Sequence, residues 1–159
     1  KATGNQPPMV AFGAVKGKLD YEMLENRRFI AKHGLSRFHF NPHFPVNTLM
    51  LMRGAIAAEM DDRLADYVEA GLTSMWEQGL KMDDPEIYVE AMTKAGLDGA
   101  ALLEQTQNPT VKAKLVENTT AAVERGAFGI PTFYVGDEMF FGKDRLGQVE
   151  EAIVAASAR

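Results

Sequence analysis

The position of the extended segment constrains the fold of this chain more than any other sequence feature. Residues 21–125 carry apolar side chains at helical spacing, interrupted by glycine stop signals. After Pro131 the pattern changes to PTFYV and EMFF around Gly136-Asp137, which predicts a β-hairpin, and a last helix follows Gly142. A two-stranded hairpin with one helix is not stable alone in water. The sheet must therefore be covered by the helical region or completed by further strands.

Local signals place the helix ends and the apolar faces. Asp84 followed by Pro85 predicts an N-cap and a first-turn proline. In the last helix the apolar residues Leu146, Val149 and Ile153 are spaced on one face, which we expect to face the core.

Composition limits the class of protein. With 159 residues, 46% of them hydrophobic and 25% charged, the chain is expected to form about one globular domain. A net charge of -5 argues against a nucleic-acid partner, since phosphate-backbone binding needs a basic surface. No apolar run reaches the roughly 18 residues of a membrane span, and no charged-then-apolar leader is visible. We expect a soluble protein of the cytoplasm, without a membrane partner.

The absence of cysteine limits the chemistry. With no cysteine, these 159 residues supply no disulfide, thiolate zinc site or thiol nucleophile. Any sulfur chemistry must therefore use a thiol from elsewhere.

The proline at the start of the predicted hairpin indicates a ligand-facing backbone. Proline has no N–H for a ladder, so within a sheet it is restricted to an edge, a strand start or a bulge. At a strand start, Pro131 leaves the backbone groups of Ile130 free to pair with a ligand. A cis Ile130–Pro131 bond would place this peptide in a tight turn, and an ordinary trans bond is the alternative.

Four segments together resemble one family. The segments are TGNQPP at 3–8, NPHFPVNTLMLMRGA at 41–55, NTTAAVERGAFGIPTF at 118–133 and FFGKDRL at 140–146. With them, the larger plan resembles the disulfide-oxidoreductase (Dsb) superfamily, and in particular the 2-hydroxychromene-2-carboxylate isomerases and the kappa-class glutathione transferases. The resemblance implies an α/β thioredoxin-like fold of the DsbA and kappa-transferase type, with a cis-proline and an all-helical insertion.

The resemblance also implies a domain organisation. Residues 1–20 are expected to be a loop from the N-terminal thioredoxin-like half, 21–125 the helical insertion domain, and 126–159 the C-terminal thioredoxin-like part. Family members begin with a βαβ unit of roughly 30 or more residues, which is not visible in this chain. In the family that unit carries a serine or a Cys-x-x-Cys, so the residue that activates the thiol is expected upstream of Lys1.

Glutathione is the cofactor that the resemblance implies. In the family, backbone before the cis-proline pairs with the cysteinyl part of glutathione, and the Gly-x-Asp-Arg segment holds its γ-glutamyl end. The residues carried over are Asn5, Ile130, Pro131, Phe141, Gly142, Lys143, Asp144 and Arg145. Plain structural roles remain open for three of them: Asn5 as a turn residue, Asp144 as an N-cap and Arg145 as a surface charge.

An aromatic small molecule is the implied substrate. Lys16 or Lys18, then Tyr21, resemble a lysine and a tyrosine that line the family's pocket, and a lysine there could attract a substrate carboxylate. Phe44 is a reasonable wall for a flat aromatic ring. His39 and His43 have the spacing of a metal pair, but Pro42 argues against a helix and no third ligand is evident, so no metal is predicted.

The implied activity is glutathione-dependent cis-trans isomerisation of 2-hydroxychromene-2-carboxylate to trans-o-hydroxybenzylidenepyruvate, as in the degradation of aromatic compounds. Three alternatives stay open: glutathione conjugation of the kappa type, DsbA-like thiol-disulfide exchange, and a non-catalytic thioredoxin-fold binding module. Related enzymes are commonly dimers, so a homodimer is expected.

Overall fold

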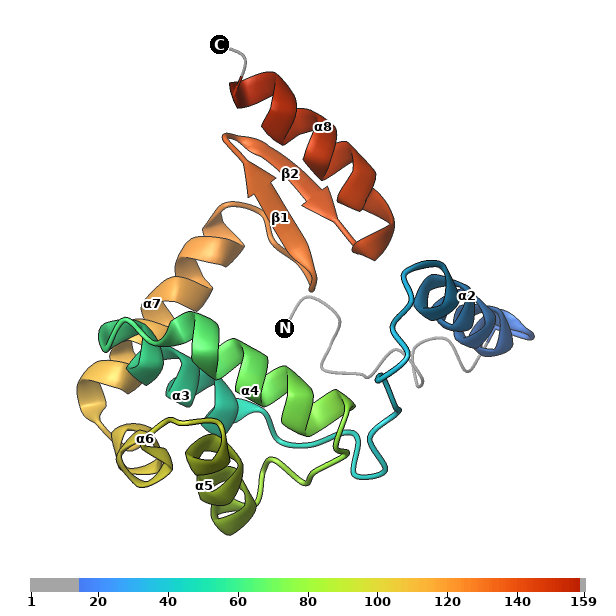
Figure 1. Cartoon of the computed structure of the whole chain (residues 1–159). Coiled ribbons are helices and arrows are strands. Elements are labelled where there is room, and N and C mark those ends of the chain that lie inside the picture. Colours follow the sequence, from blue (N-terminus) through green and yellow to red (C-terminus); the bar gives the residue numbers. More distant parts are fainter. Residues whose placement is uncertain (1–14, 158–159) are drawn as a thin grey trace. The chain divides into compact units, whose positions relative to one another are not determined.

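The computed structural model describes residues 15–157 (Figure 1). Helices dominate, and the described strands form one antiparallel pair. The helices are α2 (Lys18–Lys32), α3 (Leu49–Met60), α4 (Leu64–Trp76), α5 (Pro85–Lys94), α6 (Gly99–Gln105), α7 (Pro109–Glu124) and α8 (Leu146–Ser157), with a 3-10 turn η1 (Lys143–Arg145). The strands are β1 (Thr132–Val135) and β2 (Glu138–Phe141). None of the described helices combines the length and the apolar character needed to cross a bilayer.

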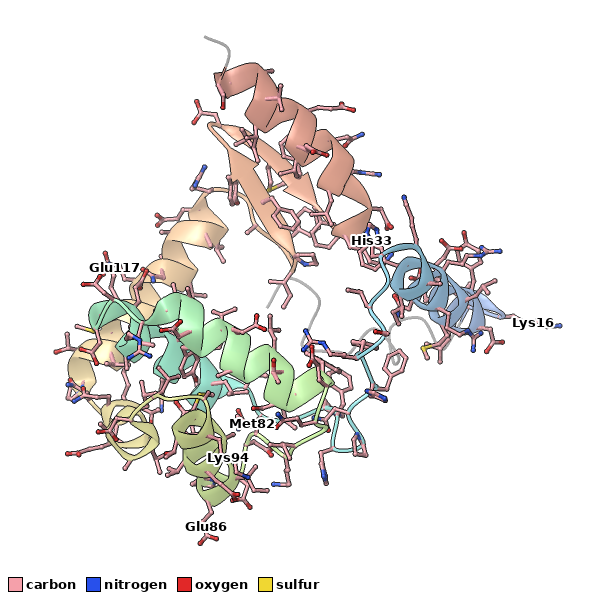
Figure 2. All side chains as sticks on the ribbon, viewed as in Figure 1. Lys16, His33, Met82, Glu86, Lys94 and Glu117 are labelled. Atoms are coloured by element: carbon pink, nitrogen blue, oxygen red, sulfur yellow. The ribbon has the colours of Figure 1, made fainter. Side chains whose placement is uncertain are left out.

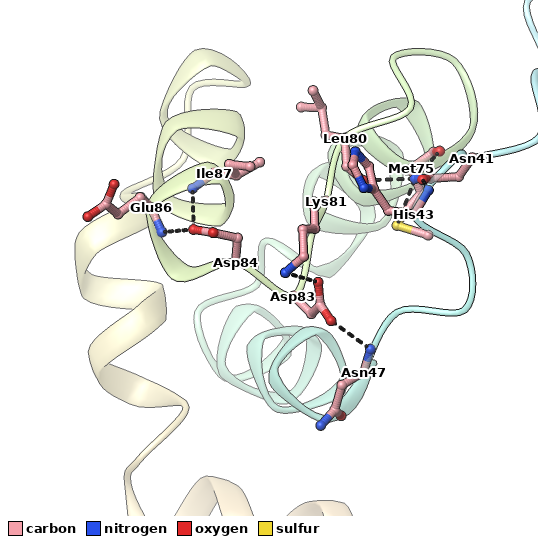
Figure 3. Close-up of polar contacts among 10 residues, drawn as sticks. All are labelled: Asn41, His43, Asn47, Met75, Leu80, Lys81, Asp83, Asp84, Glu86 and Ile87. Carbon is pink, nitrogen blue, oxygen red and sulfur yellow. Dashed lines mark hydrogen bonds and ion pairs between the residues drawn. The ribbon is translucent and has the colours of Figure 1, made fainter.

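The predicted helix start at Asp84 is confirmed. Its carboxylate accepts hydrogen bonds from the N–H groups of Glu86 and Ile87 at 3.0 and 3.4 Å, and Pro85 occupies the first turn (Figure 3). The same helix ends at Lys94, and Gly96 follows with φ of 80°. A side-chain cap of this kind stabilises a helix by about 1 kcal/mol.

The chain forms two compact units. One comprises Lys1–Leu19 together with Thr120–Arg159, and the other comprises Asp20–Thr119. The assignment of residues 21–125 to an insertion domain, and of 1–20 and 126–159 to a thioredoxin-like half, stays a prediction.

The helical unit has the larger core. Its apolar side chains come from α3, α4, α5 and α6, and Val111 of α7 adds to them. Burial of each large apolar side chain contributes about 1.5–3 kcal/mol. The largest fully buried side chains of this unit are Met82, Tyr88, Met92, Thr106 and Val111.

Two tyrosines meet at the centre of this core. The Tyr67 hydroxyl donates to the Leu51 carbonyl at 2.9 Å, and the Tyr88 hydroxyl donates to the Tyr67 oxygen at 3.2 Å. On α3, Gly54 is the residue that faces both hydroxyls. A Cβ added at Gly54 would lie closer than 3.0 Å to each hydroxyl oxygen. The missing side chain of Gly54 therefore leaves the space in which the two hydroxyls meet.

This tyrosine pair predicts a specific loss of stability in alkali. Burial raises the pKa of Tyr67 and of Tyr88 above the ordinary value of 10.0. Because the folded state keeps both phenols protonated while the unfolded state ionises them, stability is full below pH 10 and falls as the pH rises above it. The expected slope is about 0.7 kcal/mol per pH unit for each tyrosine around pH 10, where half of the unfolded phenols are ionised, and it approaches about 1.4 kcal/mol per pH unit above that. Denaturant titrations between pH 9 and 11 should show a shallower slope in Tyr67→Phe, and an unchanged slope would contradict the expectation.

A buried asparagine orders the loop between α2 and α3. Asn41 is 5% exposed, and its Nδ2 donates to the carbonyls of Met75 and Leu80 at 2.9 and 2.8 Å (Figure 3). Its Oδ1 accepts from the N–H of His43 at 2.7 Å. Further along the chain Asp83 accepts from the N–H of Asn47 at 3.1 Å. These contacts tie the loop to the segment that follows α4.

The C-terminal unit contains the hairpin and the last helix. Strand β1 pairs with β2 in antiparallel register, with Thr132 opposite Phe141 and Val135 opposite Glu138. Figure 1 shows α8 lying against the hairpin, and its contacts are with β1 and η1. The hairpin and its Gly136-Asp137 turn are confirmed.

One expectation for the last helix is wrong. No residue of α8 is buried: Leu146 and Ile153 are 41% and 50% exposed, and Val149 is half-buried. The described sheet has only two strands, so it offers α8 little surface to cover.

Candidate functional site

The peptide before the hairpin is exposed to solvent. The Ile130–Pro131 bond is cis, as the family resemblance implies. The Ile130 side chain is 92% exposed, and within the described residues neither its N–H nor its carbonyl has a hydrogen-bond partner. The carbonyl of Pro131 does have one, because the N–H of Gly142 donates to it at 2.9 Å. This bond places the exposed peptide beside the segment that leads into α8.

Two aromatic rings support this peptide from the side. Phe141, at the end of β2, packs against Phe128 with ring centroids 4.6 Å apart. Gly129 lies so close to the Phe141 ring that an added Cβ would meet it at 3.0 Å. The Thr132 hydroxyl donates to the Gly129 carbonyl at 2.6 Å. The backbone from Gly129 to Thr132 is thereby held between a ring contact and a hydrogen bond.

The turn before α8 carries the charged residues of the site. Gly142 has φ of 94°, a left-handed conformation that favours glycine, and the N–H of Arg145 donates to its carbonyl at 3.1 Å. The Asp144 side chain is 72% exposed, and its Oδ1 lies 2.8 Å from Nζ of Lys143. No capping hydrogen bond from Asp144 occurs in the described part of the chain, so its carboxylate is not used as an N-cap.

The sequence reasoning missed a contact that braces the hairpin. The Arg125 guanidinium lies 3.8 Å from the ring centroid of Tyr134 and donates to the Gly136 carbonyl at 3.0 Å. The Tyr134 hydroxyl in turn donates to the carbonyls of Ala122 and Arg125 at 3.4 and 3.3 Å. A cation–π contact of this kind contributes about 0.5–1 kcal/mol at an exposed position. The end of α7 is therefore fixed to β1, the strand that begins beside Pro131.

This arrangement suits an extended ligand with a charged end. A free N–H and a free carbonyl on one residue can pair with the backbone of a peptide. A helix N-terminus with an adjacent carboxylate can hold both charges of an amino-acid group. The site thus has the donors and acceptors for a short zwitterionic peptide.

The other predicted site residues lie elsewhere in the chain. Lys16 is exposed just before α2, and its side chain projects away from the chain in Figure 2. Tyr21 is 56% exposed in the first turn of α2. Phe44 is 52% exposed and packs against Trp76 with ring centroids 5.7 Å apart. Asn5 lies outside the described residues. Within the C-terminal unit the structure brings together Ile130, Pro131, Phe141 and the turn at 142–145.

Two histidines of the α2–α3 loop, His39 and His43, take part in local hydrogen bonds. Nδ1 of His39 lies 2.7 Å from the carbonyl oxygen of Arg37, and the N–H of His43 donates to Asn41. Within residues 15–157 no group of three or more His, Asp or Glu side chains is placed to hold a metal ion.

Comparison with known proteins gives the family. A family model described as a DSBA-like thioredoxin domain matches residues 1–154. The chain belongs to the family of DSBA-like thioredoxin domains.

Individual relatives are isomerases and transferases. A 2-hydroxychromene-2-carboxylate isomerase of Pseudomonas putida is 29% identical over 141 residues, which cover 87% of this chain and 67% of the relative. The isomerase of Pseudomonas sp. (strain C18) is 32% identical over 111 residues, which cover 70% and 50%. Glutathione S-transferase kappa 1 of Homo sapiens is 29% identical over 162 residues, which cover 92% and 69%.

A solved structure of 2-hydroxychromene-2-carboxylate isomerase has a similar fold. The TM-score is 0.75 at 28% sequence identity, and the match covers 93% of this chain and 75% of that chain. The chain thus has a DsbA-like thioredoxin fold and is distantly homologous to these isomerases and to kappa-class transferases. Its matches span half to two thirds of the length of the two Pseudomonas isomerases.

Proposed function

We propose that this protein is a glutathione-dependent isomerase that converts 2-hydroxychromene-2-carboxylate to trans-o-hydroxybenzylidenepyruvate in the degradation of aromatic compounds. The observation that carries the proposal is the exposed Ile130 peptide, whose N–H and carbonyl have no hydrogen-bond partner among residues 15–157. The Gly142–Pro131 hydrogen bond holds this peptide beside the charged turn at 143–145. Similarity to three named isomerases supports the choice of reaction.

The residues present fit glutathione, a tripeptide with a free ammonium and two carboxylates. The N–H and carbonyl of Ile130 pair with the backbone of the cysteinyl residue in this proposal. Asp144 takes the ammonium, and the backbone N–H groups at the start of η1 and α8 take the neighbouring carboxylate. The Lys143 ammonium, which contacts Asp144 at 2.8 Å, is then displaced towards a ligand carboxylate.

Bound glutathione supplies a thiol that adds reversibly to a conjugated double bond and so allows rotation about it. The chain's own residues hold the tripeptide in place and set its direction. The proposal also includes a residue that stabilises the glutathione thiolate. This residue is a serine or a cysteine, and it is proposed to lie upstream of Lys1. Lys16, Tyr21 and Phe44 are proposed to contact the aromatic carboxylate substrate, and Asn5 to contact glutathione. A cytoplasmic homodimer is the proposed form of the protein.

Charge removal at Asp144 is expected to weaken glutathione binding about tenfold, because a charge-assisted hydrogen bond to the ammonium contributes about 1.5–3 kcal/mol, partly screened at this exposed site. The measurement is calorimetric titration of the full-length protein with glutathione, for the wild type and Asp144→Asn. The matched control is Asp137→Asn, which removes the same charge from the exposed hairpin turn, where asparagine is also favoured. Absence of binding to the wild type at millimolar glutathione, or equal weakening by both substitutions, would contradict the proposal.

Glutathione conjugation of the kappa type is the second candidate. The similarity to glutathione S-transferase kappa 1, which covers 92% of this chain, favours it. Product analysis with an electrophilic aromatic substrate separates the two: free glutathione is recovered after isomerisation, and a thioether accumulates after transfer. Thiol-disulfide exchange would require a Cys-x-x-Cys from outside these 159 residues, and a non-catalytic module would bind glutathione without turnover.

A further inference from the structure

A cavity of about 380 Å³ lies within the helical unit, between residues 34–38 and one face of α4. Leu35 and Leu72 contribute apolar side chains to its wall, and they are 43% and 53% exposed. The volume falls in the range of about 300–1,000 Å³ that is typical of small-molecule pockets. None of the residues proposed to bind glutathione or its substrate lines this cavity.

Aromatic rings form part of the wall, and further aromatic rings pack against them. Phe38 and Trp76 both line the cavity, with ring centroids 5.7 Å apart and an angle of 20° between the ring planes. Phe40 packs edge-on against Phe38 at 5.2 Å, and Phe44 packs against Trp76. The N–H of His39 donates to the Trp76 carbonyl at 2.6 Å and ties the two segments together. Phe38 and Trp76 are half-buried, so part of each residue remains open to a ligand.

The charged groups at the cavity select against an anion. Arg37 lies 3.2 Å from Glu77, so the one cation on the wall is already neutralised. Glu69 also lines the cavity and has no ion-pair partner within the described residues. A ligand carboxylate would meet a net negative wall and would have to displace Glu77 from Arg37.

We propose that this cavity is a second binding site, which takes an uncharged planar aromatic molecule of one or two fused rings. The rings of the ligand pack against the side chains of Trp76 and Phe38, because offset or edge-on aromatic contacts add about 0.5–1.5 kcal/mol to the free energy gained from burial. Leu35 and Leu72 cover the apolar rim. The ligand differs from the proposed substrate, which carries a carboxylate, and its binding does not depend on glutathione.

This proposal is tested by titrating two matched ligands and following the signal of Trp76, which is the only tryptophan of the sequence. The full chain is labelled with 5-fluorotryptophan, and the resonance of Trp76 is assigned by its loss in Trp76→Phe. Coumarin is titrated against coumarin-3-carboxylate, which has the same rings with one negative charge, without glutathione. Coumarin should shift the resonance with a dissociation constant of about 0.1–1 mM, and the carboxylate should bind at least about fivefold more weakly.

Two substitutions on the same helix, α4, test whether coumarin binds in this cavity. Leu72→Glu places a charge on the rim at an exposed position and should weaken coumarin binding at least about tenfold. Leu64→Glu makes the same change at a position that is 37% exposed and does not line the cavity, and should leave binding unchanged. No shift with coumarin, equal or tighter binding of the carboxylate, or equal loss in both variants would overturn the proposal.

Discussion

Replacement of Gly54 by alanine is expected to destabilise the protein by about 2–4 kcal/mol, one of the two largest effects expected of a single substitution. The new Cβ would lie closer than 3.0 Å to the hydroxyl oxygens of Tyr67 and Tyr88. Both tyrosines are at least 97% buried, so their rings have little room to withdraw. If the Tyr67 hydroxyl is pushed aside, it also loses its 2.9 Å hydrogen bond to the Leu51 carbonyl. Denaturant unfolding of the wild type and the variant measures the difference.

The control for this prediction is Gly71→Ala. Gly71 is a glycine within α4, and an added Cβ there would meet no atom within 4 Å. Alanine should therefore stabilise the protein by up to about 1 kcal/mol through its higher helix propensity. Adding Tyr88→Phe to Gly54→Ala removes one of the two clashing oxygens, so the double variant should recover part of the loss. A neutral Gly54→Ala variant would show that the packing around the tyrosine pair is loose.

Replacement of Asn41 by alanine is expected to cost about 2–4 kcal/mol of stability. The Asn41 amide satisfies the carbonyls of Met75 and Leu80 and the N–H of His43, all through a side chain that is 5% exposed. Truncation removes this partner from the Met75 carbonyl and the His43 N–H. The Leu80 carbonyl still accepts from the N–H of Met82 at 3.1 Å. A buried polar group without a partner costs about 1–3 kcal/mol. Thermal unfolding with a denaturant titration measures the loss.

Asn47→Ala is the matched control in the same loop. The Asn47 side chain is exposed and accepts a single hydrogen bond, from the N–H of Leu49 at 3.1 Å, so its loss should cost less than about 1 kcal/mol. Asn41→Ala should also alter the fluorescence of Trp76, because the loop that Asn41 orders carries Phe38 and Phe44 against that ring. Equal costs for the two substitutions would mean that the buried amide does not order the loop.

The sequence alone predicted features that depend on neighbours along the chain. Asp84 and Pro85 start a helix because the capping carboxylate and the N–H groups it accepts from lie within three residues. The hairpin followed from the strand residues on each side of Gly136. The family resemblance implied the cis bond at Pro131. The roles given to Asn5, Lys16, Tyr21 and Phe44, and to the glutathione-contacting residues, stay predictions.

The expectation for α8 shows where this reasoning ends. The spacing of Leu146 and Ile153 tells which side chains share a face, and it says nothing of how much surface another element offers to that face. In the structure those side chains are 41% and 50% exposed.

The sequence by itself predicted the hairpin and the helix start at Asp84, and it excluded thiol chemistry by these residues, while the cis-proline followed from the family resemblance. Only the tertiary structure decided that Gly54 makes room for two tyrosines, that Asn41 ties residues 34 and 39 positions away, and that Phe128 packs on Phe141. It also showed that Phe38 and Trp76 share one cavity. The physical reason is that local propensity acts over a few residues, whereas these contacts join residues far apart in the chain whose pairing depends on packing.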